Sequence, residues 1–344
     1  MALAAARLPV TAQPLPGAAD ATRLHALFER HWEESARRIP EWATWRGDYR
    51  YGDRFTDASP AGRAAQDAWT RELLQEAEAV PPPALSATDR VSRELFSSAL
   101  AQQVRLQAYP GWRSRTLVSQ WGFQSQLSDL MQLSPVSSAA EVRQMLVRLA
   151  AYPARVDQEI VRLREGLAAG WMSSRLVLER VLEQIDGQLP ADAAESPFYA
   201  PFKALGAGIA PAEQASLRDQ ARQAIANHVY PALRKLRDFA QNECLPKAPP
   251  DGALSRYPSG SAVYAELVRQ HTTTELTPQQ IHDLGRRQLV RLRGEMEAAM
   301  RETGFKGDFA AFVAYLDSDP KFFHTSPEAL LAGYRDIGKR IEPE

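Results

Sequence analysis

The feature that most constrains the fold is an almost unbroken helical pattern between residues 138 and 187. Its apolar residues recur every three or four positions, as at Val142, Met145 and Leu149 and again at Val156 and Ile160. This spacing places an apolar stripe along one face of an α-helix. The alternating β-branched runs that signal strands are absent from the sequence. The pattern therefore predicts an all-α fold, a large multi-helix bundle or array of about ten to twelve helices.

Capping residues, prolines and glycines set the boundaries of the other predicted helices. Pro40 ends the first one, and the aromatic segment with Gly47 and Gly52 that follows it is predicted to be an ordered loop. In the helix from Thr277, the apolar side that includes Leu289 and Met296 is predicted to face inward. The longer predicted helices cover residues 21–39, 59–78, 86–108, 138–169, 173–187, 211–244 and 277–302.

Composition excludes several classes of protein. Apolar residues make up 44% of the chain and charged residues 24%, which is typical of a globular protein. The net charge of −1 offers no polycationic surface for nucleic acid. The single cysteine, Cys244, excludes an internal disulfide and a multi-cysteine zinc site. No stretch approaches the ~20 apolar residues of a membrane span.

The first twenty residues differ from the rest of the chain. Small apolar residues lead to Val10-Thr11-Ala12 and then to a linker rich in proline and glycine. This is typical of the end of a secretory signal with cleavage after Ala12, although the basic region that precedes such signals is missing; the alternative is a frayed terminus. We therefore expect residues 1–20 to be a signal remnant and linker, residues 21–344 to form a single helical domain, and the protein to be periplasmic or secreted, with the cytoplasm as the alternative.

Residues 257–302 are the region where chemistry is most expected. A short helix ends here at His271, followed by a run of threonines. Tyr264, His271 and Thr272 are candidate substrate-binding residues. For His271 a role at the helix C-terminus is favoured over a catalytic one, and the threonines either donate to a substrate or satisfy the last carbonyls of the helix. Trp112, Trp121 and Phe123 either line a pocket or seal the gap between helical layers.

Histidine–carboxylate pairs at one-turn spacing are a second kind of candidate. His25 with Glu29 and His31 with Glu34 have the spacing of metal ligands. They do not converge on one face, since His31 lies among apolar positions, so a core histidine and a solvated face are favoured.

Several short phrases occur in an order that resembles a known bacterial family. They are PEWAT at 40–44 with Gly47, LREG at 163–166 with Ala169-Gly170, ERVL at 179–182, SPFY at 196–199, HTT at 271–273 with Thr277-Pro278 and Ile281-His282, and Asp319-Pro320 to Ser326-Pro327-Glu328. Together they resemble the domain-of-unknown-function 885 family over nearly the whole chain.

The resemblance implies a helical zinc metallopeptidase-like hydrolase of small peptides or peptide-like amides. Its signature is a helical H-E-x-x-H motif, in which two histidines bind zinc and the glutamate polarises water. This sequence contains no H-E-x-x-H, so it corresponds to the family's N-terminal half, and none of its residues is assigned as catalytic or as a metal ligand. Zinc is expected only in a full-length protein, and this chain alone is predicted to be inactive. More chain is expected after Glu344 to cover the last helix, whose apolar side carries Tyr334 and Ile337. The alternative is a non-catalytic helical protein that binds a peptide or protein partner.

Overall fold

The computed structural model describes residues 18–342, which divide into two compact units at Thr272–Thr273. The first unit ends with Thr272 and the second begins with Thr273. The predicted cleavage site after Ala12 lies outside the described residues. The prediction of a single helical domain from residue 21 to residue 344 stays a prediction.

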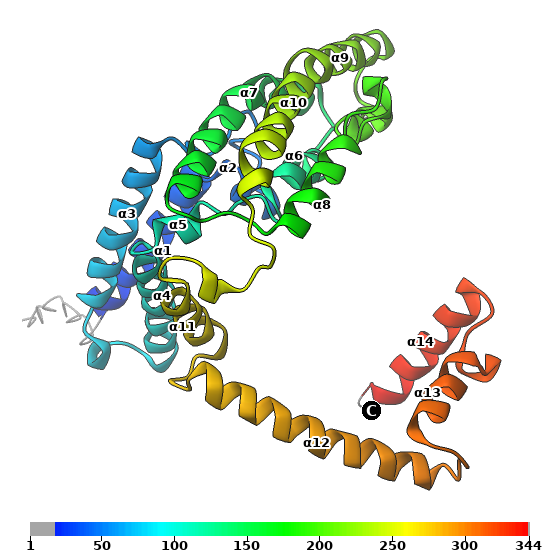
Figure 1. The fold of residues 1–344 in the computed structure, drawn as a ribbon. Helices are drawn as coiled ribbons and strands as arrows, with labels where there is room; N and C mark the ends of the chain where they lie inside the picture. Colours follow the sequence, from blue (N-terminus) through cyan, green and yellow to red (C-terminus); the bar gives the residue numbers. More distant parts are fainter. Residues whose placement is uncertain (1–17, 343–344) are drawn as a thin grey trace, which may run out of the picture. The chain divides into compact units, whose positions relative to one another are not determined.

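The described residues of both units are helical and contain no strand, which confirms the predicted all-α class. Figure 1 shows the helices in chain order. In the first unit the α-helices are α1 (Ala18–Arg38), α2 (Pro40–Trp45), α3 (Pro60–Glu78), α4 (Ala87–Leu106), α5 (Pro110–Arg113), α6 (Phe123–Leu133), α7 (Ala139–Ala168), α8 (Arg175–Asp186), α9 (Pro211–Ala224), α10 (Tyr230–Phe239) and α11 (Gly260–Thr272).

Short 3-10 and π-helical turns connect them. The 3-10 turns are η1 (Pro82–Ala84), η2 (Ala193–Glu195), η3 (Ala200–Ala204), η6 (Leu245–Lys247) and η7 (Leu254–Arg256), and the π turns are η4 (Ile225–Val229) and η5 (Ala240–Cys244). The predicted helix at 211–244 is thus one continuous helical run, in which the two π turns η4 and η5 alternate with α9 and α10. None of the described helices has the length and apolar content that a membrane span requires.

Helix α7 forms the centre of the first unit. A capping box starts it, because Ser138 Oγ accepts from the Glu141 backbone N–H and Glu141 accepts from that of Ser138. Its stripe of Val142, Leu149 and Val156 is fully buried in a core cluster that also contains residues of α6, α8, α9 and α10. Pro153 lies inside the helix and does not divide it.

The segment after Pro40 corrects one prediction. Residues 40–45 are not loop but form the short helix α2, with Pro40 in its first turn. A proline at that position loses no intrahelical hydrogen bond, and its fixed φ suits a helix start. Pro40 therefore ends α1 and begins α2. The helix brings Glu41 and Trp42 toward α7, where they contribute to the cleft described below.

His31 on α1 lies in a small aromatic cluster. Its ring stacks on Trp69 at 5.7 Å between centroids and meets Phe96 edge-on at 5.0 Å. Burial lowers the pKa of His31 below its usual 6.5. This agrees with its interpretation as a core histidine.

We expect this lowered pKa to make stability depend on pH. The unfolded chain takes up a proton at His31 near pH 6.5 while the folded chain still excludes it, so the free energy of unfolding should fall as the pH drops below 6.5. Thermal melts of the wild type and His31→Phe across this range test it. The stability gap between the two should shift in favour of the variant as the pH falls. A constant gap would contradict the assignment.

The second unit consists of α12 (Pro278–Glu302), α13 (Phe309–Ser318), η8 (Pro320–Phe322) and α14 (Pro327–Ile341). The predicted capping box of Thr277 and Gln280 is present. However, the α12 side predicted to face inward is exposed, with Leu289 at 69%. Among the described residues of this unit only Met300 is buried, because two short helices cannot cover a helix of 25 residues.

Candidate functional site

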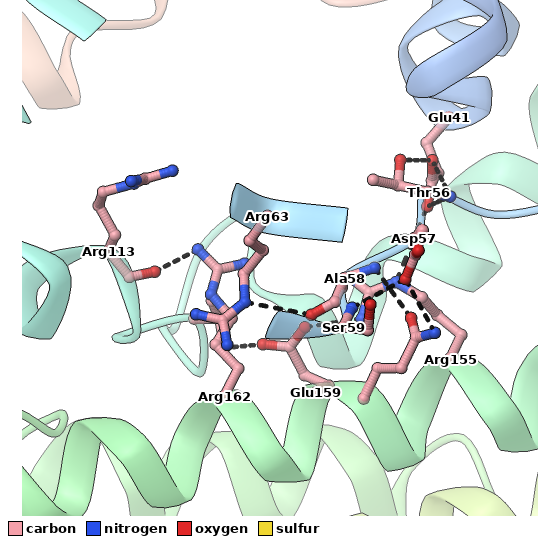
Figure 2. Close-up of polar contacts among 12 residues, drawn as sticks. Glu41, Thr56, Asp57, Ala58, Ser59, Arg63, Arg113, Arg155, Glu159 and Arg162 are labelled. Atoms are coloured by element: carbon pink, nitrogen blue, oxygen red, sulfur yellow. Dashed lines mark hydrogen bonds and ion pairs between the residues drawn. The ribbon is translucent and has the colours of Figure 1, made fainter. Parts of the chain in front are cut away.

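A charged cleft lies in the first unit where α2, α3, α5 and α7 approach one another. Its main cavity has a volume of about 520 Å³, and two smaller ones of about 300 and 250 Å³ share lining residues with it. Figure 2 shows the polar side chains that these elements contribute. The charged residues lining the three cavities are Glu41, Arg46, Asp57, Arg63, Asp67, Arg113, Arg115, Arg155, Glu159, Arg162 and Glu165.

The floor of the cleft is a buried ion pair on α7. Arg155 Nη1 lies 2.8 Å from Glu159 Oε2, and the two side chains come from adjacent turns of the helix. Arg155 is 8% exposed and Glu159 is fully buried. Glu159 also accepts a hydrogen bond from the Thr116 hydroxyl. Charges at this depth persist only when paired, so the Arg155–Glu159 pair is a fixed part of the cleft.

Glu41 of α2 approaches the same arginine from the opposite side. Its Oε1 lies 3.9 Å from Arg155 Nε, a nitrogen that is buried and has no hydrogen-bond partner among the described residues. The carboxylate accepts from the backbone N–H and the hydroxyl of Thr56, as Figure 2 shows. These bonds tie α2 to the segment that leads into α3 and fix one wall of the cleft.

Arg148, one turn before Tyr152 on α7, secures the segment 46–57 beside the cleft. The guanidinium is fully buried and donates to the backbone carbonyls of Arg54 and Tyr51 and to Thr44 Oγ1. Burial lowers the pKa of Arg148, and burial also raises the pKa of Tyr152.

The opposite wall is formed by arginines paired with carboxylates. Arg113 Nη2 lies 2.6 Å from Asp67 Oδ1, and Arg63 Nη2 lies 2.6 Å from Glu165 Oε2. Both pairs connect α3 to another element, α5 in the first case and α7 in the second. They hold α3 beside α7 and leave their guanidinium groups at the cavity surface.

Arg162 differs from these arginines because it forms no ion pair with any described residue. Its Nη2 donates to the backbone carbonyl of Arg113 (Figure 2), and its buried Nε has no hydrogen-bond partner in the described part of the chain. Burial lowers the pKa of Arg162; the nearby charge of Glu159 opposes that shift, and those of Arg155, Arg63 and Arg113 add to it.

The predicted substrate-binding residues lie elsewhere. Tyr264, His271 and Thr272 all belong to α11, and none lines the three cavities. Tyr264 and His271 are exposed, and the Thr272 hydroxyl donates to the Val268 carbonyl at 2.8 Å. Their role in binding substrate stays a prediction.

Of the three aromatic residues predicted either to line a pocket or to seal a gap, two line a cavity and the third, Trp112, lines none of the three cavities. Trp121 and Phe123 line the smallest cavity, whereas Trp112 packs edge-on against Trp171 at 6.0 Å. Phe123 also belongs to the main core cluster, and Trp112 packs against the small cluster of Trp171, Tyr257 and Val263.

The donors present do not fit a metal centre. Within residues 18–342, no three side chains of histidine, cysteine, aspartate or glutamate are grouped so that they could hold a metal ion. His25 bonds Asp89 at 2.8 Å, and His31 stacks on Trp69. We therefore assign no metal-binding role to the side chains of residues 18–342.

The sequence does contain a pattern that indicates the cleft, but the residues of this pattern lie directly beside the apolar stripe of the same helix. Arg148, Tyr152, Arg155, Glu159 and Arg162 follow one another at intervals of four, three, four and three residues. That spacing is a second row on the same helix, parallel to the apolar one. Titratable residues at helical spacing inside a core helix are thus the pattern that points to this site.

The fold and the cleft define an all-α protein with a charged site built on one long core helix. A family model described as "Bacterial protein of unknown function (DUF885)" matches residues 40–344, and the chain belongs to this family. The predicted family is thus confirmed. No curated protein matches the sequence.

Among solved structures, the chain is similar to "The crystal structure of the putative lipoprotein from Colwellia psychrerythraea". The TM-score is 0.80 at 18% sequence identity, over 94% of this chain and 58% of that one. At this identity the likeness shows the fold alone. The present chain thus spans 58% of the length of that solved chain.

Proposed function

We propose that this chain supplies the scaffold and one substrate-cleft wall of a zinc-dependent peptidase or amide hydrolase acting on small peptides or peptide-like amides. The observation that supports it is the cleft on α7. Its main cavity of about 520 Å³ has the size of a small-ligand site, and its lining combines two tryptophans with seven charged side chains. Buried charged groups of this kind gather at functional sites more often than elsewhere.

The proposal assigns zinc binding and water activation to residues outside 18–342, because the donors within this range do not converge. Two histidines one turn apart would hold the zinc, and a glutamate would take a proton from the attacking water. The role of the present chain is then to bind and orient the peptide.

The test uses the natural gene product at its full length. Its zinc content is measured by elemental analysis, and cleavage of a mixed peptide pool is followed by mass spectrometry with and without a zinc chelator. We expect about one zinc per chain and cleavage that the chelator abolishes. The 1–344 chain alone should show neither. A natural product that captures a peptide or protein partner without zinc or turnover would replace this proposal with the non-catalytic binding alternative.

We further propose that the protein is exported. The sequence around Val10-Thr11-Ala12 supports this, and the similar solved structure is described as that of a "putative lipoprotein". Amino-terminal sequencing of natively exported protein should begin at Gln13. An intact Met1 in native material would contradict cleavage.

A further inference from the structure

Arg162 lies at the junction of the cleft. It alone of the described residues lines all three cavities. Three carboxylates that line the two smaller cavities with it are already engaged: Glu159 with Arg155, Asp67 with Arg113 and Glu165 with Arg63. A guanidinium that is half-buried and has no carboxylate partner costs free energy in the absence of a ligand.

The geometry of a guanidinium fits one kind of ligand group best. Its parallel N–H groups match the two oxygens of a carboxylate, and a charge-assisted pair of this type is among the stronger polar contacts. Arg162 uses Nη2 for the Arg113 carbonyl, and its Nε is without a partner in the described residues.

A phosphate dianion fits less well. Glu41, Asp57 and Glu159 line the same cavities and would repel a second negative charge. A single carboxylate places one negative charge opposite Arg162, which lines all three cavities and forms no ion pair with a described residue.

Two exposed tryptophans line the main cavity and the smallest one. Trp45 is 46% exposed and lines the main cavity, while Trp121 is 83% exposed and lines the smallest. Their ring centroids are 6.5 Å apart in an edge-on arrangement. Trp121 has a φ of +57°, which is rare for a bulky residue. Strained backbone of this kind is concentrated at binding sites.

We propose that Arg162 binds a carboxylate of a peptide-like ligand whose apolar part lies against Trp45 and Trp121. This deepens the proposed function, on which it rests for the peptide character of the ligand. The carboxylate is either the ligand's carboxyl terminus or an acidic side chain. Binding of this carboxylate by Arg162 leaves the Arg155–Glu159 ion pair unchanged.

The test measures binding to the 1–344 chain by calorimetry, without zinc or turnover. The first probe is N-acetyl-leucyl-phenylalanine, and the second is its carboxyl-terminal amide, which differs only in the charge. We expect the acid to bind roughly 10- to 100-fold more tightly than the amide. N-acetyl-aspartyl-phenylalanine amide, whose only carboxylate is on its side chain, distinguishes the two sources of the group.

Arg162→Gln provides the residue-level test. The glutamine amide retains a donor for the Arg113 carbonyl but removes the charge, so binding of the acid should weaken to that of the amide while binding of the amide stays unchanged. The matched control is Arg164→Gln on the same helix, since Arg164 is exposed, pairs with Glu243 at 2.8 Å and lines none of the three cavities. Thermal melts confirm that both variants fold.

The outcomes separate this inference from the hydrolase proposal. Equal binding of acid and amide, unchanged binding in Arg162→Gln, or no binding of either probe would each overturn it. Inorganic phosphate that displaces the acid and binds more tightly would overturn the choice of a carboxylate. Absence of zinc or cleavage in the full-length protein would overturn the hydrolase alone, because binding by the 1–344 chain is measured independently.

Discussion

Replacing Glu159 with alanine should lower the free energy of unfolding by about 3–5 kcal/mol. The substitution leaves the Arg155 charge in a site where only 8% of the residue is exposed. Glu41, 3.9 Å from Arg155 Nε, compensates in part, so the lower end of the range is expected. All seven tryptophans lie between residues 32 and 171, so urea denaturation followed by tryptophan fluorescence reports on the first unit alone.

The matched control for Glu159→Ala is Glu165→Ala on the same helix. Glu165 pairs with Arg63 at a solvent-exposed position, and such pairs contribute about 1 kcal/mol or less. The double variant Arg155→Met with Glu159→Leu should recover only part of the loss. The unpaired Arg155 charge is then removed, but buried Glu41 loses its ion pair and keeps only its hydrogen bonds from Thr56. Similar losses in the two single variants would show that the depth of the Arg155–Glu159 pair has no energetic effect.

Replacing Phe198 with alanine should lower the free energy of unfolding by about 3–5 kcal/mol. The side chain is fully buried and belongs to the main core cluster around α7. Truncation leaves a cavity in this cluster that the packed neighbours can fill only in part. The same fluorescence-detected urea titration measures it.

Leu95→Ala is the control for Phe198→Ala, since Leu95 is an exposed apolar residue of the same unit. We expect it to change stability by no more than about 0.5 kcal/mol. A small effect at Phe198 would mean that the segment 196–202 separates from the core without unfolding it.

Helix positions were predictable because they depend on local signals. Ser59 Oγ accepts from the Gly62 backbone N–H at 3.0 Å, as its place before Pro60 predicts, and the capping box at Thr277 is formed. The apolar stripe of α7 is buried as its period predicts. The family was likewise recognisable from short phrases distributed along the chain.

The row of titratable residues on α7 is visible in the helical period, but the residues that it meets in the cleft, and one part of the core, depend on contacts between distant residues, which the period does not encode. Phe198 lies in a segment rich in proline that has no period, yet it is fully buried in the core cluster that also contains residues of α9 and α10. Arg162 and Arg113 are 49 positions apart. The exposed side of α12 shows the converse, since an amphipathic pattern predicts an apolar face and does not specify what covers it.

The two parallel rows on α7 make its length critical. Each residue advances an α-helix by about 100°, so deleting one residue between Arg148 and Arg162 rotates every later side chain by that angle. Charged groups would then enter the apolar core, and apolar groups would line the cleft. Insertions and deletions should therefore be tolerated in the loops around α7 and excluded from its middle. A scan of single-residue deletions along the gene would show this as a gap in tolerance centred on Arg155 and Glu159.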